Sequence, residues 1–132
     1  MLLQAEHQRQ RIMQYLNAEL NPLRTCPPHP GVIRLYGVCD EGRHTHKNNR
    51  VEHVIYVVQE LALNGELFDY VALSNFDDKI IRCIARQLFK AVKHMKEGGF
   101  THRDIKPENV VVDTDYTLKI IDWGFAKAYQ QG

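Results

Sequence analysis

The sequence has little cysteine and no C-x-x-C pair, which argues against a disulfide framework. The three cysteines, Cys26, Cys39 and Cys83, are an odd number. Reduced thiols are typical of cytoplasmic or nuclear proteins, so we expect the chain in the cytoplasm, with the nucleus as the alternative. A zinc-organised interaction module is a remaining alternative, although its residues match no common ligand spacing. It would use Cys26, His29, Cys39, His44 and His46.

The chain also lacks an excess of charge and any long apolar run. Its 17 Lys and Arg residues face 16 Asp and Glu residues, a formal net charge of +1. A chain this close to neutral has no strong field to attract nucleic acid or an anionic membrane without specificity. No stretch approaches the roughly 18 apolar residues of a membrane-spanning helix, and the N-terminus does not resemble a secretory signal. We therefore expect neither nucleic acid nor a membrane among its partners.

What is present has the composition of an ordinary globular domain. Hydrophobic residues make up 44% of the 132 residues and charged residues 25%. These fractions exclude a wholly disordered chain. The length is that of one small domain or of part of a larger one.

The first part of the chain predicts a helix followed by two strands. Apolar residues at helical spacing favour a helix over 4–20, which we expect Asn21-Pro22 and then the proline-rich stretch 27–31 to stop. Residues 32–39 are rich in β-branched and aromatic side chains and predict a strand. The polar stretch 40–50 reads as a loop, and 51–61 as a second, largely buried strand. We expect the two strands to pair antiparallel.

The middle of the chain predicts two further helices. A short amphipathic helix covers 66–73, and a longer one covers 77–97. Asn75 or Asp77 can cap the long helix, and Gly98-Gly99 ends it. Its polar face carries a basic stripe, which usually means a solvated surface and less often a nucleic-acid site. The stripe consists of Arg82, Arg86, Lys90 and Lys93.

The last part of the chain predicts a tight hairpin beside a loop rich in polar groups. Strands over 110–112 and 118–121 flank an Asp-containing turn. The preceding loop carries the carboxylate of Asp104, the ammonium of Lys106 and the carboxamide of Asn109. The far arm of the hairpin returns a second carboxylate, Asp122, to the same end. A carboxylate and an amide oxygen suit Mg²⁺, while a second carboxylate near a lysine suits proton acceptance beside a transferring phosphate. The set indicates phosphoryl transfer.

The strings H-R-D-I-K-P-E-N at 102–109 and D-W-G at 122–124 resemble the catalytic and metal-binding loops of eukaryotic protein kinases. The resemblance implies that Asp104 accepts the proton of the substrate hydroxyl and that Lys106 steadies the transferring phosphate. It also implies that Asn109 and Asp122 bind Mg²⁺. ATP and Mg²⁺ are the implied cofactors. The K-P-E-N string is similar to that of Ser/Thr kinases, so the implied substrate is a protein with a Ser or Thr hydroxyl.

Other parts of the sequence resemble the same family. Residues 56–62 are similar to the strand that enters the hinge between the two lobes of a kinase. The resemblance places Gln59 at the gatekeeper position and the backbone of Glu60 and Ala62 against adenine. Glu66 would reach the ribose or a basic substrate residue, although a Glu also simply favours the first turn of a helix. The last site residues implied are His102 as a buttress, Arg103 as a phosphate partner, Val111 under adenine and Trp123 as an apolar plug.

Several parts of the family's pattern are missing from this sequence. It holds neither G-x-G-x-x-G nor the V-A-I-K strand, and its motifs cover only the middle of the family's domain. In the first helix Arg9 stands where the family has a Glu, for which Glu6 is a possible substitute. The fold implied is an incomplete two-lobed α+β kinase fold, with part of the N-lobe at 1–60 and part of the C-lobe at 61–132. We expect part of the apolar face of 77–97 to be exposed.

The resemblance as a whole implies an ATP-dependent protein serine/threonine kinase, present as a partial catalytic domain. The string G-E-L-F-D-Y-V at 65–71 is most similar to the calcium/calmodulin-dependent and AMP-activated branch. The alternative is a catalytically inactive kinase remnant that acts as a protein-binding module. The sequence does not indicate an oligomeric state.

Overall fold

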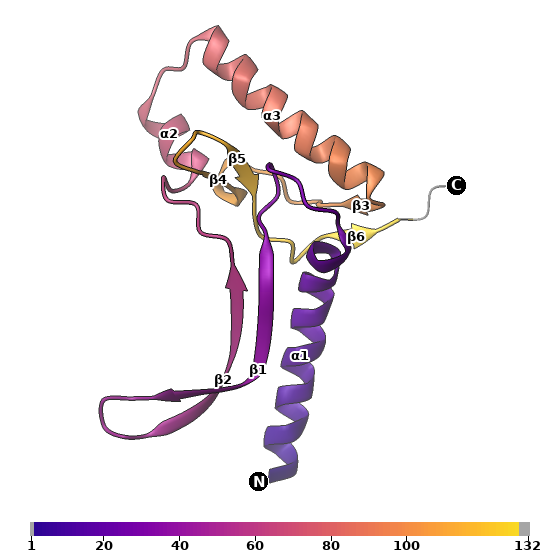
Figure 1. Ribbon diagram of the computed structural model, residues 1–132, viewed down its shortest axis with the longest axis vertical. Helices are drawn as coiled ribbons and strands as arrows, with labels where there is room; N and C mark the ends of the chain where they lie inside the picture. Colours follow the sequence, from indigo (N-terminus) through magenta and orange to yellow (C-terminus); the bar gives the residue numbers. More distant parts are fainter. Residues whose placement is uncertain (1, 130–132) are drawn as a thin grey trace.

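The computed structural model describes residues 2–129, except for the side chains of 2–6, 8 and 18. Helix α1 and the ribbon of β1 and β2 extend together from one side of the core, and α3 lies across the other side (Figure 1). The larger elements are α1 (Leu2–Thr25), β1 (Leu35–Thr45), β2 (Val51–Gln59), α2 (Leu67–Leu73), α3 (Asp78–Glu97), β4 (Val110–Val112) and β5 (Leu118–Ile120). The short ones are β3 (Phe100–Thr101), the 3-10 turn η1 (Pro107–Asn109) and β6 (Lys127–Ala128).

Helix α1 continues through Pro22, so the prediction that this proline stops the helix was wrong. A proline in the last turn removes only one intrahelical N–H bond, and the carbonyls around it find other donors. The N–H of Cys26 donates to the carbonyl of Pro22 at 2.8 Å, and the hydroxyl of Thr25 donates to that of Asn21 at 2.8 Å. The helix therefore reaches the core with its last turns.

Strands β1 and β2 pair antiparallel, as predicted, but their bounds and burial differ from the prediction. Strand β1 begins at Leu35 and runs to Thr45, so most of the expected loop 40–50 is strand. Strand β2 is mostly exposed, because the ribbon has two strands and few side chains pack on it. An irregular register between Cys39 and Gly42 lets the ribbon bend away from the body (Figure 1).

A single core joins the two halves of the chain. The segment after α1 pairs with β5, where the N–H of Ile33 donates to the carbonyl of Ile120 at 3.1 Å and the N–H of Ile120 donates to that of Gly31 at 3.0 Å. Buried side chains from α1, this segment, α3 and the β4–β5 hairpin form one cluster. The core residues include Leu23, Cys26, Val32, Ile33, Ala91, Met95, Val110, Ile120 and Trp123. The division into lobes at residue 60 remains a prediction.

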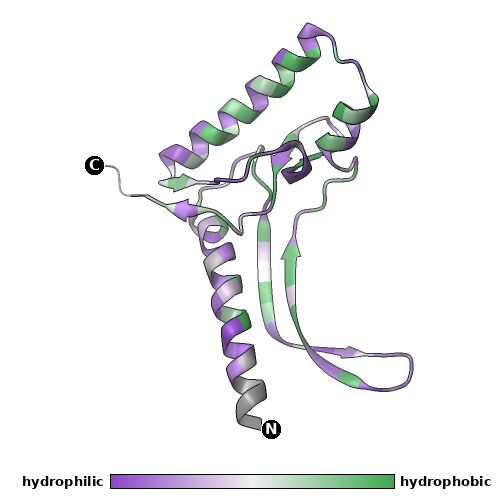
Figure 2. Cartoon of the chain, turned by 180° about the vertical axis from the view of Figure 1, so that it is seen from behind, coloured by the Kyte–Doolittle hydropathy of each residue, from purple (hydrophilic) through white to green (hydrophobic). Residues whose placement is uncertain are grey.

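Helix α3 matches the predicted helix closely. The carboxylate of Asp77 accepts from the N–H of Ile80 at 2.8 Å, which identifies the N-cap, and Gly98 and Gly99 follow the last turn. The expected exposure of its apolar face is confirmed, because Phe89 is 73% exposed. Apolar residues recur along the whole helix in Figure 2. No helix in the described part of the chain is both long and apolar enough to span a membrane.

Candidate active site

The loop between β3 and η1 is held by a buried histidine. The N–H of Asp104 donates to Nδ1 of His102 at 3.3 Å, so Nε2 carries the proton and donates to the carbonyl of Ile121 at 2.9 Å. His102 is only 1% exposed, and burial lowers its pKa below the ordinary value. A neutral imidazole thus links the loop to the residue before Asp122. The predicted role of His102 as a buttress agrees with these bonds.

Asp104 lies at the centre of a hydrogen-bonded group. Its Oδ2 accepts from Nζ of Lys106 at 2.9 Å and from Nδ2 of Asn109 at 2.8 Å. The same amide nitrogen donates to the backbone carbonyl of Asp104 at 2.9 Å. The geometry brings together three of the predicted site residues. It also fixes the carboxylate without burying it, since Asp104 stays partly exposed to solvent.

The charges of this group reinforce one another. The hydrogen bond from Lys106 is the main cause that lowers the pKa of Asp104, with a smaller contribution from Asn109. In turn the bond to Asp104 raises the pKa of Lys106. At neutral pH the pair is therefore a carboxylate beside an ammonium. Such a pair can accept a hydrogen bond from a hydroxyl and stabilise a negative group next to it.

Asn109 and Asp122 present oxygen donors from adjacent segments. The carbonyl of Asn109 accepts from the N–H of Ile121 at 2.9 Å, which places Asp122 beside the loop. The amide nitrogen of Asn109 donates to Asp104, whereas its Oδ1 has no hydrogen bond to a described residue. The carboxylate of Asp122 is exposed and only weakly bonded, to the N–H of Gly124 at 3.4 Å. A free amide oxygen and an exposed carboxylate fit Mg²⁺, which takes few protein ligands.

The backbone of the site is strained at two of its residues. Arg103 has φ of 71° and Asp122 has φ of 56°, both in the left-handed region that non-glycine residues rarely adopt. The Nε–H of Arg103 donates to the carbonyl of Phe125 at 2.6 Å, which ties the loop to the chain after Asp122. Strain of this kind persists where the surrounding contacts over-determine it, and it gathers at functional sites.

Trp123 is buried as the predicted apolar plug. It is 2% exposed and meets the ring of His102 edge-on, with ring centroids 5.6 Å apart. Its indole N–H is buried without a hydrogen-bond partner. The plug thus packs well but leaves one polar group unsatisfied.

A cleft of about 350 Å³ lies next to this cluster, and three of the four predicted nucleotide residues, Glu60, Ala62 and Val111, line it. Its lining contains Gln59, Glu60, Ala62, Val111 and Asp122. The carbonyl of Glu60 and the N–H of Ala62 make no backbone hydrogen bond to a described residue, so both are available. Glu66 pairs with Val111 through an isolated bridge but does not line the cleft. Its predicted contact with ribose remains a prediction.

The structure identifies Glu19 as the acidic residue of α1 that reaches the cleft, and sequence reasoning missed it. The prediction that Arg9 stands where the family has its helix Glu was wrong. Arg9 does not line the cleft and donates instead to the carbonyl of Asp40 in β1 at 2.7 Å. The side chain of Glu6 lies outside the described residues. No local signal in the sequence identifies Glu19, because the turn of α1 that faces the cleft is set by the packing of the end of the helix, where Leu20 is buried.

The zinc alternative finds no support in the described residues. No group of three or more His, Cys, Asp or Glu side chains among them is arranged to hold a metal ion. Cys26 is buried in the core, whereas Cys39 is exposed on the ribbon. His44 and His46 contact each other, and His46 pairs with Glu52 at 2.9 Å.

Comparison with known proteins agrees with this geometry. The family described as "Protein kinase domain" matches residues 2–132. The chain belongs to the protein kinase family. The expected incomplete α+β kinase fold is thereby confirmed.

Curated kinases show how far the similarity extends. Serine/threonine-protein kinase ppk21 of Schizosaccharomyces pombe is 34% identical over 87% of this chain and 19% of its own length. Serine/threonine-protein kinase ksg1 of the same yeast is 34% identical over 86% of this chain and 18% of its length. Maternal embryonic leucine zipper kinase of Danio rerio is 39% identical over 73% of this chain and 13% of its length. The chain thus spans about a fifth or less of the length of these relatives.

Proposed function

We propose that this chain provides the catalytic and metal-binding part of a protein serine/threonine kinase, which transfers phosphate from Mg-ATP to a protein hydroxyl. The observation that carries the proposal is the position of Asp104 between Lys106 and Asn109, with Asp122 beside them. Relatives named as serine/threonine-protein kinases support the substrate class. The proposal covers the activity of the whole protein, its protein substrate and its use of ATP.

In this mechanism Asp104 accepts a hydrogen bond from the substrate hydroxyl and orients its oxygen toward the phosphate. Phosphoryl transfer needs mainly positioning and charge stabilisation, so an ionised carboxylate of low pKa suffices to take the proton late in the reaction. Lys106 stabilises the charge of the transferring group. Bound Mg²⁺ would neutralise phosphate charge, and Oδ1 of Asn109 with the carboxylate of Asp122 would hold it.

The nucleotide would enter through the cleft. Adenine presents a hydrogen-bond donor next to an acceptor, which the carbonyl of Glu60 and the N–H of Ala62 can match. Val111 would lie against the ring, and Gln59 would border the inner end. The polar groups then fix the orientation while the apolar lining excludes water.

The experiment that tests this proposal measures phosphate transfer from labelled ATP to a Ser/Thr peptide. We expect Asp104→Asn to lower the rate about 100-fold or more, because the side chain keeps its shape but loses its charge. Asp115→Asn is the matched control, since Asp115 lies in the β4–β5 turn and bonds only to Thr117. Full activity of Asp104→Asn would refute the role of Asp104.

A non-catalytic binding role is the second candidate, and one observation favours it. The apolar face of α3 is partly uncovered, with Phe89 73% exposed, and an exposed apolar face can bind a partner. A chain with this role would not be stabilised by Mg-ATP against thermal unfolding, whereas a ligand that binds the native state raises the melting temperature. A clear rise at millimolar Mg-ATP would count against this candidate.

A further inference from the structure

A second cavity, of about 560 Å³, borders the nucleotide cleft on the other side of Glu60. The two hollows share only Leu23, Ile33 and Glu60 among their lining residues. Apart from Glu60, no residue assigned to the reaction lines the second cavity. Its volume lies within the range of small-molecule sites, about 300–1,000 Å³. This cavity therefore needs a separate explanation.

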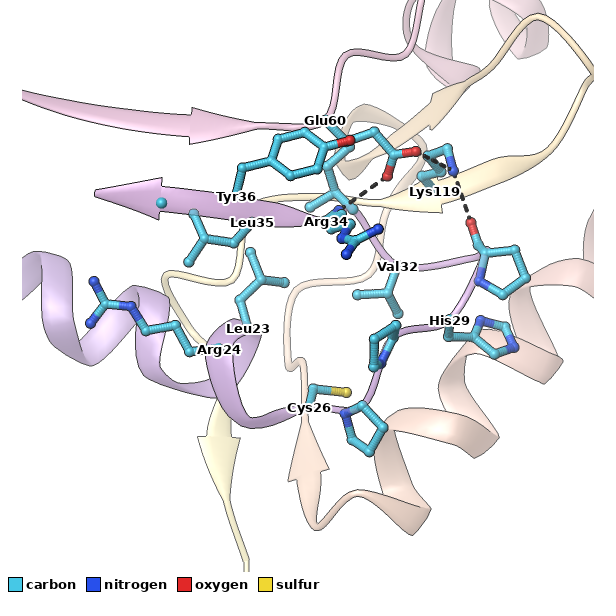
Figure 3. A pocket seen from close by; sticks show the side chains of 15 residues that line it. Leu23, Arg24, Cys26, His29, Val32, Arg34, Leu35, Tyr36, Glu60 and Lys119 are labelled. Carbon is cyan, nitrogen blue, oxygen red and sulfur yellow. Dashed lines mark hydrogen bonds and ion pairs between the residues drawn. The ribbon is translucent and has the colours of Figure 1, made fainter. Parts of the chain in front are cut away.

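The inner wall of the cavity is apolar. Leu23, Val32 and Ile33 are buried there, and prolines of the loop after α1 line another side. Cys26 adds a thiol whose pKa burial raises above its usual value, so it stays neutral near pH 7. Figure 3 shows this thiol among the apolar side chains. Such a wall favours the hydrophobic body of a ligand.

Most charged groups at the cavity already have partners. Nζ of Lys119 lies 2.9 Å from Oε1 of Glu60 and donates to the carbonyl of Pro30 at 3.3 Å, as the dashed lines in Figure 3 show. Oε2 of Glu60 accepts from the N–H of Arg34 at 3.2 Å. Arg24 points away along α1, where it donates to Oδ1 of Asn17 at 3.2 Å. Lys119 and Glu60 therefore neutralise each other, and Arg24 is bonded to Asn17.

The side chain of Arg34 is the exception. Its guanidinium has no hydrogen bond or ion pair to any described residue, and it lies 5.6 Å from the ring centroid of Tyr36. Figure 3 shows it between the apolar wall and the Glu60–Lys119 pair. The contact with the aromatic ring orients the cation without using its N–H donors. Arg34 is exposed, and a guanidinium with free donors is suited to a carboxylate, which it can bind through two parallel hydrogen bonds.

We propose that this cavity binds a small amphipathic anion, with an apolar body against Leu23 and Val32 and a carboxylate on the guanidinium of Arg34. The size of the cavity limits the ligand to a compact molecule rather than a protein domain. The site is separate from the nucleotide cleft, so the inference does not depend on the proposed kinase function.

Two aromatic probes of nearly the same shape test the proposal. 2-Naphthoate carries the carboxylate, and 2-naphthamide replaces it with a neutral amide. In amide chemical-shift titrations of the labelled chain, we expect 2-naphthoate to move the signals of 32–37 with saturation, and 2-naphthamide to bind at least tenfold more weakly. Arg34→Met should lower the affinity for 2-naphthoate about tenfold or more, since a charge-assisted bidentate contact is lost.

Arg24→Met is the matched control, because Arg24 borders the same cavity but is bonded to Asn17. We expect it to keep the affinity for 2-naphthoate. Arg34→Lys retains the charge without the planar fork and should bind with intermediate affinity, which keeps the test valid if Arg34→Met folds poorly. Equal binding of both probes, equal effects of the two Met variants, or shifts at the exposed face of α3 instead of 32–37 would overturn the proposal.

Discussion

The buried imidazole of His102 makes the stability of the site depend on pH. Its pKa in the folded chain lies below the ordinary value of 6.5, because burial disfavours the charged ring. Between these two values the unfolded chain binds more protons than the folded one, so stability is complete above about pH 6.5 and falls below it. Protonation of Nδ1 would also remove the acceptor for the N–H of Asp104.

We therefore predict a lower free energy of unfolding at pH 5.5 than at pH 7.5, measured by urea denaturation. His29 has a lowered pKa as well and contributes with the same sign, so the measurement is made in a His29→Gln background. The carboxyl of Asp104 has a lowered pKa too, but its effect is lost only below its ordinary value of 3.8. A stability that is constant or rises between pH 7.5 and 5.5 would contradict the role of His102.

Single residues were predictable from sequence when they lie close together along the chain. Asp104, Lys106 and Asn109 fall within six residues, so one short loop was bound to bring them together. Glu19 could not be found in this way, since its position depends on the rotation of α1 and on which turn meets the core. The unsatisfied N–H of Trp123 is likewise a matter of packing that no motif specifies.

At the scale of elements, the N-cap of α3 is a separable source of stability. Asp77 satisfies the N–H of Ile80, which has no intrahelical partner. We predict that Asp77→Ala lowers the free energy of unfolding by about 1 kcal/mol. Asn75→Ala is the control, because Asn75 was the other cap candidate and makes no such bond; it should change stability by less than about 0.5 kcal/mol. Equal effects of the two changes in urea denaturation would argue against this cap.

The packing of the segment after α1 on α3 depends on a glycine. A Cβ added at Gly31 would meet Cβ of Ala91 at 2.8 Å, whereas one added at Gly37 would meet nothing within 4 Å. Gly31→Ala should therefore destabilise the chain by about 1–3 kcal/mol, through overpacking at a buried contact. Gly37→Ala should be nearly neutral. A thermal melt in which Gly31→Ala is as stable as Gly37→Ala would show that the contact is not tight.

The elements differ in how far their sequences specify them. The bounds of α3 follow from a long helical periodicity, a polar cap and a Gly-Gly end, which are all local signals. The bounds of α1 and β1 were wrong because they depend on contacts made elsewhere. Bonds at the end of α1 compensate for Pro22, and pairing with β2 extends β1 through its polar part. The exposure of β2 reflects the narrow ribbon rather than its apolar composition.

At the scale of the whole molecule, the site depends on contact between distant segments. Glu60 follows β2, Asn109 ends the 3-10 turn η1 and Asp122 follows β5, so the three residues belong to different parts of the chain. Their relative positions are set by the shared core and by the backbone bonds of Ile120 and Ile121. The cleft that we propose for the nucleotide therefore forms only when these distant segments pack together.

NMR line broadening by paramagnetic Mn²⁺, added in place of Mg²⁺, tests the proposed metal-nucleotide site without requiring turnover. Mn²⁺ is a suitable substitute because both ions prefer oxygen ligands. With ATP present, we predict that the amide signals of Asn109 and Asp122 broaden first and that those of Glu60 and Ala62 shift. Asp122→Asn should abolish the broadening. No ATP-dependent broadening, or broadening centred on the carboxylates of Asp113 and Asp115 in the β4–β5 turn, would contradict the proposed metal-nucleotide site.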